Sequence, residues 1–276
     1  MDLSVKPPRW KGLVPRFLTA VAVSLVCIVP FYFGGLAWAV LVAVFASRIM
    51  YEWVRMTDPD APALTLALSI AALLVALTYA AQGMVIWSMI ALVLFTFVAV
   101  FERMRRSDPK WAAFGLPYVI VPAMLLVILR GDAAGFDTRG FTQLIFVILI
   151  VVAADVGAYF GGSSIGGPKL APKLSPNKTW SGVLVGLAFA TIVGVIVGLV
   201  IGVSPWVSIL LAVPIVVLSV LGDLLESTVK RRIGVKDTGT LLPGHGGLLD
   251  RLDSLMAAVV GAAFIFMFLG ERWPIA

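Results

Sequence analysis

Long apolar runs follow one another along the whole chain, and short polar segments separate them. A helix that crosses a membrane needs about 20 consecutive, mainly apolar residues. Nine runs approach this length, so the pattern predicts an all-α polytopic membrane protein with about nine transmembrane helices. The predicted spans are 17–34, 36–53, 63–81, 84–101, 111–129, 141–161, 181–202, 205–225 and 254–270.

The first run has basic residues before it and small residues after it, as a cleaved signal peptide does. Its apolar core, residues 17–33, is longer than the roughly 7–15 residues of a signal-peptide core. We therefore expect a retained first helix, with residues 6–11 as an anchor at the membrane interface.

The composition agrees with this class of protein. The 276 residues are 61% hydrophobic and 13% charged, with a mean hydropathy of +1.04, whereas soluble domains carry about 25% charged residues. No polar stretch is long enough for a separate soluble domain. We expect one transmembrane domain over 1–276, with N-terminal helices in 1–140 and the longest loops in 141–276. The single cysteine, Cys27, excludes an internal disulfide.

The distribution of positive charge predicts the orientation in the membrane. With the N-terminus placed in the cytoplasm, the inner segments hold 18 of the 21 Lys and Arg residues, and the outer segments hold three. Because Lys and Arg are enriched in cytoplasmic loops, we predict a cytoplasmic N-terminus and an outer C-terminus. No nucleic-acid partner is expected from the net charge of +6, since the most charged loop lacks aromatic side chains that stack on bases.

Two inner loops, 161–181 and 226–253, are longer than the others and rich in Gly, Pro, Lys and Ser. The window 223–253 alone contains five of the 15 acidic residues, five of the 21 basic residues and the only histidine. A loop that merely joins two membrane helices needs none of these. Both loops face the cytoplasm in the predicted topology and are candidates for one shared site.

Four acidic residues stand in two pairs around the second loop. Asp223 and Glu226 are three apart at the end of one predicted helix, and Asp250 and Asp253 have the same spacing at the start of the next. Side chains three apart share a helix face. Carboxylates brought together repel unless a cation neutralises them, an arrangement that holds Mg²⁺ against substrate phosphates. Salt bridges at the membrane interface are the alternative interpretation.

The segment between these acidic pairs offers groups that suit phosphate. Its glycine-rich turn, PGHGG at 243–247, lets backbone N–H groups approach an anion. His245 is expected to order the loop or contact phosphate rather than act as a base, because a phosphate that attacks another is already anionic at neutral pH. A general excess of positive charge on inner loops is the alternative for the basic residues, which are Lys230, Arg231, Arg232 and Lys236.

The first loop follows an acidic residue placed inside an apolar run. Asp155 lies in the sixth run, where an ionised carboxylate costs at least about 2.5–3.5 kcal/mol, so it is expected to face a polar cavity or a buried polar partner. The segment SPNKT at 175–179 resembles a helix start, and helix N-termini favour anions. The residues that could contact a polyphosphate are Lys169, Lys173, Ser175, Lys178 and Thr179.

Two further patterns have a structural interpretation. Glu52 and Glu102, at the inner ends of predicted helices, are expected to be interfacial. Small residues at GxxxG spacing let transmembrane helices approach closely, so we expect them to pack helices within one chain or between two. These pairs are Gly157/Gly161, Gly182/Gly186, Gly194/Gly198 and Gly198/Gly202.

The second loop contains STVKR from Ser227, KD from Lys236, and LPGHGGLLDRLD from Leu242 to Asp253. This pattern resembles the signature of phosphatidate cytidylyltransferases, also called CDP-diacylglycerol synthases. The first loop is similar to the family's other cytoplasmic segment at Asp155, Tyr159, Lys169, Pro172, Lys173, Ser175, Pro176, Lys178 and Thr179. The chain departs from the family at Ser181, where glutamate is usual, and in 161–168, which is poorer in basic residues.

The resemblance implies a Mg²⁺-dependent enzyme of phospholipid biosynthesis that makes CDP-diacylglycerol and pyrophosphate from CTP and phosphatidate. It also implies a site on the cytoplasmic face of the inner membrane, a 141–276 half that carries the catalytic residues, and a homodimer. The expected metal ligands, for Mg²⁺ alone or with a second cation, are Asp223, Asp250 and Asp253. These three are also expected to be catalytic, together with Lys230, Arg231 and Lys236. The expected substrate-binding residues are Asp155, Lys169, Lys173, Ser175, Pro176, Lys178, Thr179, His245, Gly246, Gly247 and Arg251.

Three alternatives stay open on the sequence alone. A related cytidylyltransferase with another lipid acceptor is one, since nothing in the apolar runs identifies an acyl chain. A membrane transporter with a cytoplasmic cation site is less well supported, because transport sites usually lie near the bilayer midplane, whereas most acids here stand at inner helix ends. A catalytically silent relative is the third, raised by Ser181.

Overall fold

In the computed structural model, long helices account for most of the described residues, which are 25–239, 246–269 and 273. Eight helices are long and apolar enough to cross a membrane, so the chain is an integral membrane protein and the predicted all-α class is confirmed. Residues 25–33 are also helical, and the rest of the first predicted span lies outside the described residues. The eight are α2 (Gly35–Thr57), α3 (Ala63–Ala81), α4 (Val85–Arg103), α5 (Lys110–Arg130), α6 (Arg139–Ser164), α7 (Trp180–Val200), α8 (Pro205–Ile233) and α9 (Leu249–Leu269).

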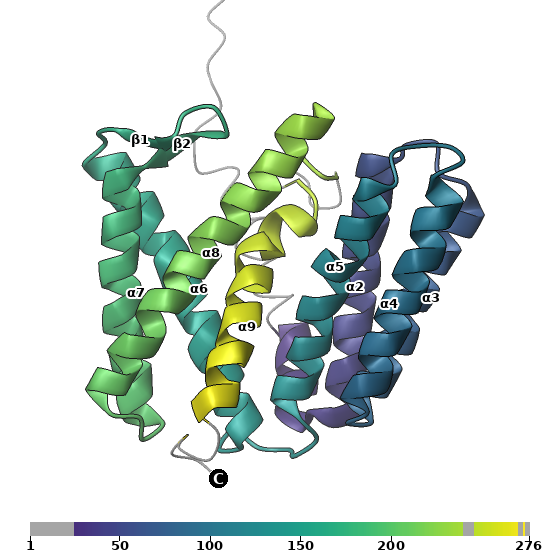
Figure 1. The fold of residues 1–276 in the computed structure, drawn as a ribbon. Helices are drawn as coiled ribbons and strands as arrows, with labels where there is room; N and C mark the ends of the chain where they lie inside the picture. Colours follow the sequence, from purple (N-terminus) through teal and green to yellow (C-terminus); the bar gives the residue numbers. More distant parts are fainter. Residues whose placement is uncertain (1–24, 240–245, 270–272, 274–276) are drawn as a thin grey trace, which may run out of the picture.

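The helices form two groups that meet at α5 and α9 (Figure 1). Helices α2 to α5 pack on one another in the N-terminal half, and α6 packs closely on α7 in the C-terminal half. Helix α8 slants across the bundle beside α9, and its C-terminal end lies at the same end of the molecule as the start of α9 (Figure 1). Helices from both halves of the sequence therefore contact α9.

Helix α8 is longer than a membrane crossing requires. Its 29 residues correspond to about 43 Å at 1.5 Å per residue, against about 30 Å for the hydrocarbon core of a bilayer. Ser204 caps the start of the helix, where its side chain accepts the N–H of Val207. Gly234, in the left-handed conformation, caps its end. Three cations in the last turn favour this C-terminus electrostatically. Its last turns can thus carry polar chemistry beyond the apolar core.

A two-stranded hairpin, not expected from the sequence, joins α6 to α7. Strand β1 (Lys169–Ala171) pairs antiparallel with β2 (Ser175–Thr179), with Lys169 opposite Thr179. The expected helix start is present directly after it, because the Thr179 side chain accepts the N–H of Gly182 at 3.1 Å. The hairpin lies at the same end of the molecule as the C-terminal end of α8 (Figure 1), and Arg231 Nε donates to the Leu174 carbonyl at 3.4 Å.

Glycines bring α6 and α7 into backbone contact. A Cβ added to Gly157 would lie 2.9 Å from the Gly186 Cα, and one added to Gly186 would lie 2.6 Å from the Ala154 carbonyl oxygen. These distances leave no room for a side chain. The GxxxG pattern therefore packs these two helices within one chain, which is one of the two arrangements that its spacing predicts.

Substitution of Gly186 by leucine should separate α6 from α7. We expect a loss of about 2 kcal/mol or more, because a large side chain forced into a packed contact shifts the backbone. Thermal unfolding of the detergent-solubilised protein measures the loss. Ala188→Leu, at an exposed position of the same helix, is the matched control and should unfold at the wild-type temperature; equal destabilisation by both would contradict the packing account.

Candidate active site

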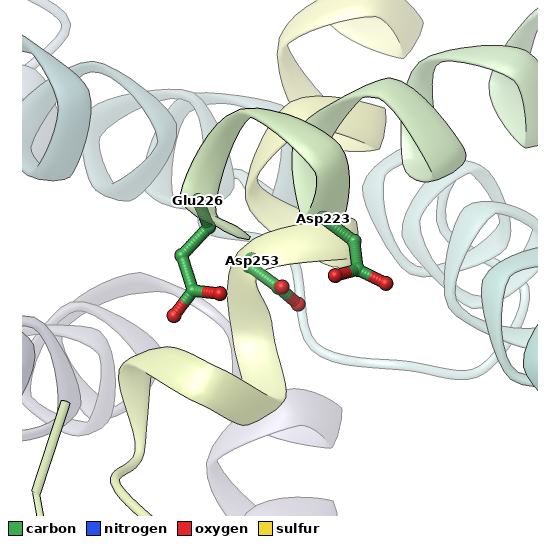
Figure 2. Close-up of side chains that lie close together, drawn as sticks. All are labelled: Asp223, Glu226 and Asp253. Atoms are coloured by element: carbon green, nitrogen blue, oxygen red, sulfur yellow. The ribbon is translucent and has the colours of Figure 1, made fainter. Parts of the chain in front are cut away.

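Three carboxylates from α8 and α9 meet near the end of the bundle at which α9 begins (Figure 2). One oxygen each from Asp223, Glu226 and Asp253 lies within 4.8 Å of the others. Asp223 and Glu226 are one turn apart on α8, and Asp253 comes from the start of α9. Gly222 permits this approach, because a Cβ there would lie 2.4 Å from the Ala257 Cβ and 2.9 Å from the Asp253 carbonyl oxygen.

Two of the three carboxylates are buried, whereas Asp223 is partly exposed and pairs with Lys178. Glu226 is 1% exposed and Asp253 is 5% exposed. Neither Glu226 oxygen forms a hydrogen bond of normal geometry with a described residue, although Oε2 lies 2.6 Å from Lys230 Nζ. Asp253 Oδ1 accepts the N–H of Ser254 at 2.6 Å. Clustered carboxylate oxygens with spare lone pairs are the ligands that Mg²⁺ prefers, so the residues present fit a divalent cation.

Asp250 is not one of this group of three carboxylates, but it shares Lys230 with Glu226. Its Oδ1 lies 2.8 Å from Lys230 Nζ, and its Oδ2 accepts the N–H groups of Gly247 at 2.8 Å and Thr238 at 3.0 Å. The structure thus groups Glu226, rather than Asp250, with Asp223 and Asp253. The three-residue spacing predicts that Asp223 and Glu226 share one face of α8, but it cannot show how that face is turned toward α9.

Two lysines neutralise the acidic residues from opposite sides. Lys230 contacts both Glu226 and Asp250, and so joins α8 to the first turn of α9. Lys178, from strand β2, forms an ion pair with Asp223. Burial lowers the pKa of the Lys178 ammonium from its usual value, while the nearby carboxylates of Asp253 and Asp155 oppose this shift. The site therefore combines a surplus of negative charge with two partly buried cations.

A cavity of about 520 Å³ adjoins the cluster between α6, α7 and α8. Asp155 lines it, as expected for an acid in an apolar span, and so do Lys178 and Thr179. Ser219 and Ser254 line the side formed by α8 and α9. The cavity thus brings together residues of the first loop and of the helices that carry the carboxylates.

Most of the other candidate residues lie outside the cavity. Arg231, Lys236 and Arg251 are exposed on or beside the ends of α8 and α9. On the hairpin, Ser175 is half-buried and the remaining candidates are exposed; these are Lys169, Lys173 and Pro176. His245 lies outside the described residues. These exposed cations lie on the hairpin and at the ends of α8 and α9.

Gly246 and Gly247, the described residues of the glycine-rich turn, lie against side chains of the chain itself. The N–H of Gly247 donates to Asp250, and a Cβ on Gly247 would lie 2.3 Å from Thr238 Oγ1 and 2.6 Å from Glu52 Oε2. Gly246 has a φ of 80°, which a side chain would disfavour. The anion that the Gly247 N–H binds here is therefore a carboxylate of α9.

Ser181 has a defined role in the fold. Its hydroxyl lies 3.0 Å from Thr179 Oγ1 and donates to the Gly166 carbonyl. It thereby fastens the segment before the hairpin to the start of α7. Serine at this position supports the loop that carries Lys178.

Comparisons with known proteins agree with the sequence resemblance. A family model described as the cytidylyltransferase family matches residues 14–269. A phosphatidate cytidylyltransferase from Brucella suis biovar 1 is 36% identical over 260 residues, 93% of each chain. Relatives of the same name come from Pseudomonas aeruginosa, at 34% identity over 95% of this chain and 100% of the other, and from Helicobacter pylori J99, at 33% over 94% and 93%.

Proposed function

Because the chain belongs to the cytidylyltransferase family, we propose that it makes CDP-diacylglycerol and pyrophosphate from CTP and phosphatidate. The observation that carries this proposal is the cluster of Asp223, Glu226 and Asp253 with Lys178 and Lys230, at one end of an apolar bundle. The names of full-length relatives support the same substrates. The reaction is a step of phospholipid biosynthesis.

The chemistry needs positioning and charge neutralisation more than proton transfer. An oxygen of the phosphatidate phosphate forms a bond to the α-phosphorus of CTP, and the bond to the pyrophosphate oxygen breaks. The attacking phosphate is already anionic at neutral pH, so the site requires no strong base. Two negatively charged reactants must be held in line while charge builds up on the leaving group.

The carboxylate cluster is proposed to hold the metal. Asp223, Glu226 and Asp253 would supply its ligands, since their oxygens lie together and those of Glu226 lack hydrogen bonds of normal geometry. Mg²⁺ supplies, when bound, positive charge against the phosphate oxygens. Asp250, by contrast, is proposed to hold Lys230 and the loop N–H groups in place.

Lysine and arginine side chains complete the proposed site. Lys178 and Lys230 would contact phosphate oxygens next to the metal ligands. The exposed cations of the hairpin and of the α8 and α9 ends would attract and retain the triphosphate, since clustered charge of one sign raises the local concentration of a counter-charged substrate. These cations are Lys169, Lys173, Arg231, Lys236 and Arg251.

The site is proposed to face the cytoplasm, where CTP is found. The predicted inner segments hold 18 Lys and Arg residues and the outer segments hold three, which supports this orientation. The protein is proposed to lie in the inner membrane. The acyl chains of phosphatidate would then stay in the bilayer while its headgroup reaches the cavity beside Asp155. A homodimer is also proposed, on the family resemblance, and the mass of the detergent-solubilised protein measures it.

A transfer assay tests the proposed substrates. Purified protein is incubated with Mg²⁺ and CTP labelled at the α-phosphate, and the label in the lipid phase is counted. We expect transfer to phosphatidate. Preferred transfer to a polyprenyl phosphate would instead identify a related enzyme with another acceptor. No transfer to either lipid, together with ion or solute flux in CTP-free proteoliposomes, would favour a transporter.

The pH dependence of this transfer tests the role of Lys178. Burial holds the pKa of its ammonium below the usual 10.5. Since the cationic form binds phosphate, activity should be lost as the pH rises through this lowered pKa. In Lys178→Arg the guanidinium stays charged, so the alkaline loss should move to higher pH. If both proteins lose activity at the same alkaline pH, the loss belongs to another group and not to Lys178.

A further inference from the structure

A buried glutamate from the N-terminal half contacts the start of α9. Glu52, near the inner end of α2, is 2% exposed. Its Oε1 accepts the N–H of Leu248 at 3.0 Å, and its Oε2 accepts the N–H of Leu249 at 2.9 Å. These bonds join positions 196 and 197 residues apart in the chain. The sequence placed Glu52 at the membrane interface, whereas the structure buries it against the helix that carries Asp253.

Glu52 acts as an N-terminal cap of α9, although it belongs to a different helix. The first N–H groups of a helix have no partner within the helix. A carboxylate that accepts two of them forms charge-assisted hydrogen bonds and lies at the positive end of the helix dipole. Arg48, 3.2 Å from Glu52 Oε1, balances the glutamate charge on the α2 side.

Two glycines of the described residues, Gly239 and Gly247, lie tightly against the Glu52 carboxylate. A Cβ on Gly239 would lie 3.1 Å from Oε1, and a Cβ on Gly247 would lie 2.6 Å from Oε2. Both glycines therefore make room for this one side chain. The loop before α9 also donates the N–H groups of Thr238 and Gly247 to Asp250. Glu52 and Asp250 thus fix the loop and the first turn of α9 together.

We propose that Glu52 is a positioning residue for the metal site. By holding Leu248 and Leu249, it sets the axial position of α9, and with it the place of Asp253 against Asp223 and Glu226. The helices of residues 1–140 then contribute directly to the reaction site, through one side chain. This inference rests on the proposed function, in which the three carboxylates hold a metal.

Metal binding without substrates separates this role from a general loss of folding. Mn²⁺, which is visible by electron paramagnetic resonance, is titrated into the purified, monodisperse protein without CTP or lipid. We expect Glu52→Ala to weaken Mn²⁺ binding by about ten- to a hundredfold, as loss of a residue that orients metal ligands does. Glu52→Gln, which keeps one acceptor oxygen, should weaken it less and serves if the alanine variant does not fold.

Glu102→Ala is the matched control. Glu102 is also an acid at the inner end of a helix in the N-terminal half, but it pairs with Arg106 and accepts from Thr65. Its replacement should leave the Mn²⁺ affinity unchanged. Wild-type affinity in the folded Glu52 variants would overturn the positioning role alone. Absence of Mn²⁺ binding by the wild type would overturn the proposed metal site and this inference with it.

Discussion

Replacement of Asp253 by asparagine should lower cytidylyl transfer about a thousandfold, the scale on which removal of a single group aimed at reacting charge acts. Asparagine has almost the same shape but lacks the negative charge. Asp253 is 5% exposed and shares its surroundings with Asp223 and Glu226, so no solvent group can replace its charge there. The turnover number at saturating CTP and phosphatidate measures the loss.

Asp60→Asn is the control for this substitution. Asp60 is an exposed acid on the loop between α2 and α3, so its replacement removes a negative charge without reaching the cluster. Wild-type turnover is expected for this variant. Turnover by Asp253→Asn within tenfold of the wild type would remove Asp253 from the proposed metal ligands, provided that the variant elutes as a folded protein.

Replacement of Lys230 by methionine should have the largest effect on stability. Lys230 lies 2.6 Å from Glu226 Oε2 and 2.8 Å from Asp250 Oδ1, and only 13% of its side chain is exposed. Its loss leaves two poorly solvated carboxylates without their shared cation. Breaking such a buried ion pair from one side costs about 3–5 kcal/mol, so we expect a large fall in unfolding temperature in detergent, and loss of transfer activity.

Two further variants identify the cause of this loss. Arg232→Met removes an exposed cation from the same turn of α8 and should change stability by less than about 0.5 kcal/mol. If Lys230 acts by neutralising Asp250, the double variant with Lys230→Met and Asp250→Asn should be more stable than Lys230→Met alone. Equal stability of the single and double variants would contradict that account.

The membrane helices could be predicted from the sequence, because apolar run length alone decides which segments can cross a bilayer. The hairpin of β1 and β2 could not. Its strands have three and five residues, too few for a recognisable alternation of apolar and polar positions. Contacts such as the one between Arg231 and Leu174 come from distant parts of the chain.

For the site, the sequence could predict which segment holds the acidic and basic residues, but not which of these side chains meet. The acidic pairs indicated a cation site near 223–253, but the partners within it depend on how α8 and α9 cross. That crossing depends on Gly222, whose missing side chain lets the helices touch. Glu52 could not have been found from local pattern at all, because its partners lie almost 200 residues away in sequence.

The most direct test of the account is the release of pyrophosphate from CTP by the purified wild-type protein. The account predicts release only when both phosphatidate and Mg²⁺ are present, with one CDP-diacylglycerol formed for each pyrophosphate. Chelation of the metal should stop the reaction, and added Mg²⁺ should restore it. Release that continues without phosphatidate, or that is unchanged after complete removal of divalent cations, would contradict metal-dependent cytidylyl transfer at the cluster of Asp223, Glu226 and Asp253.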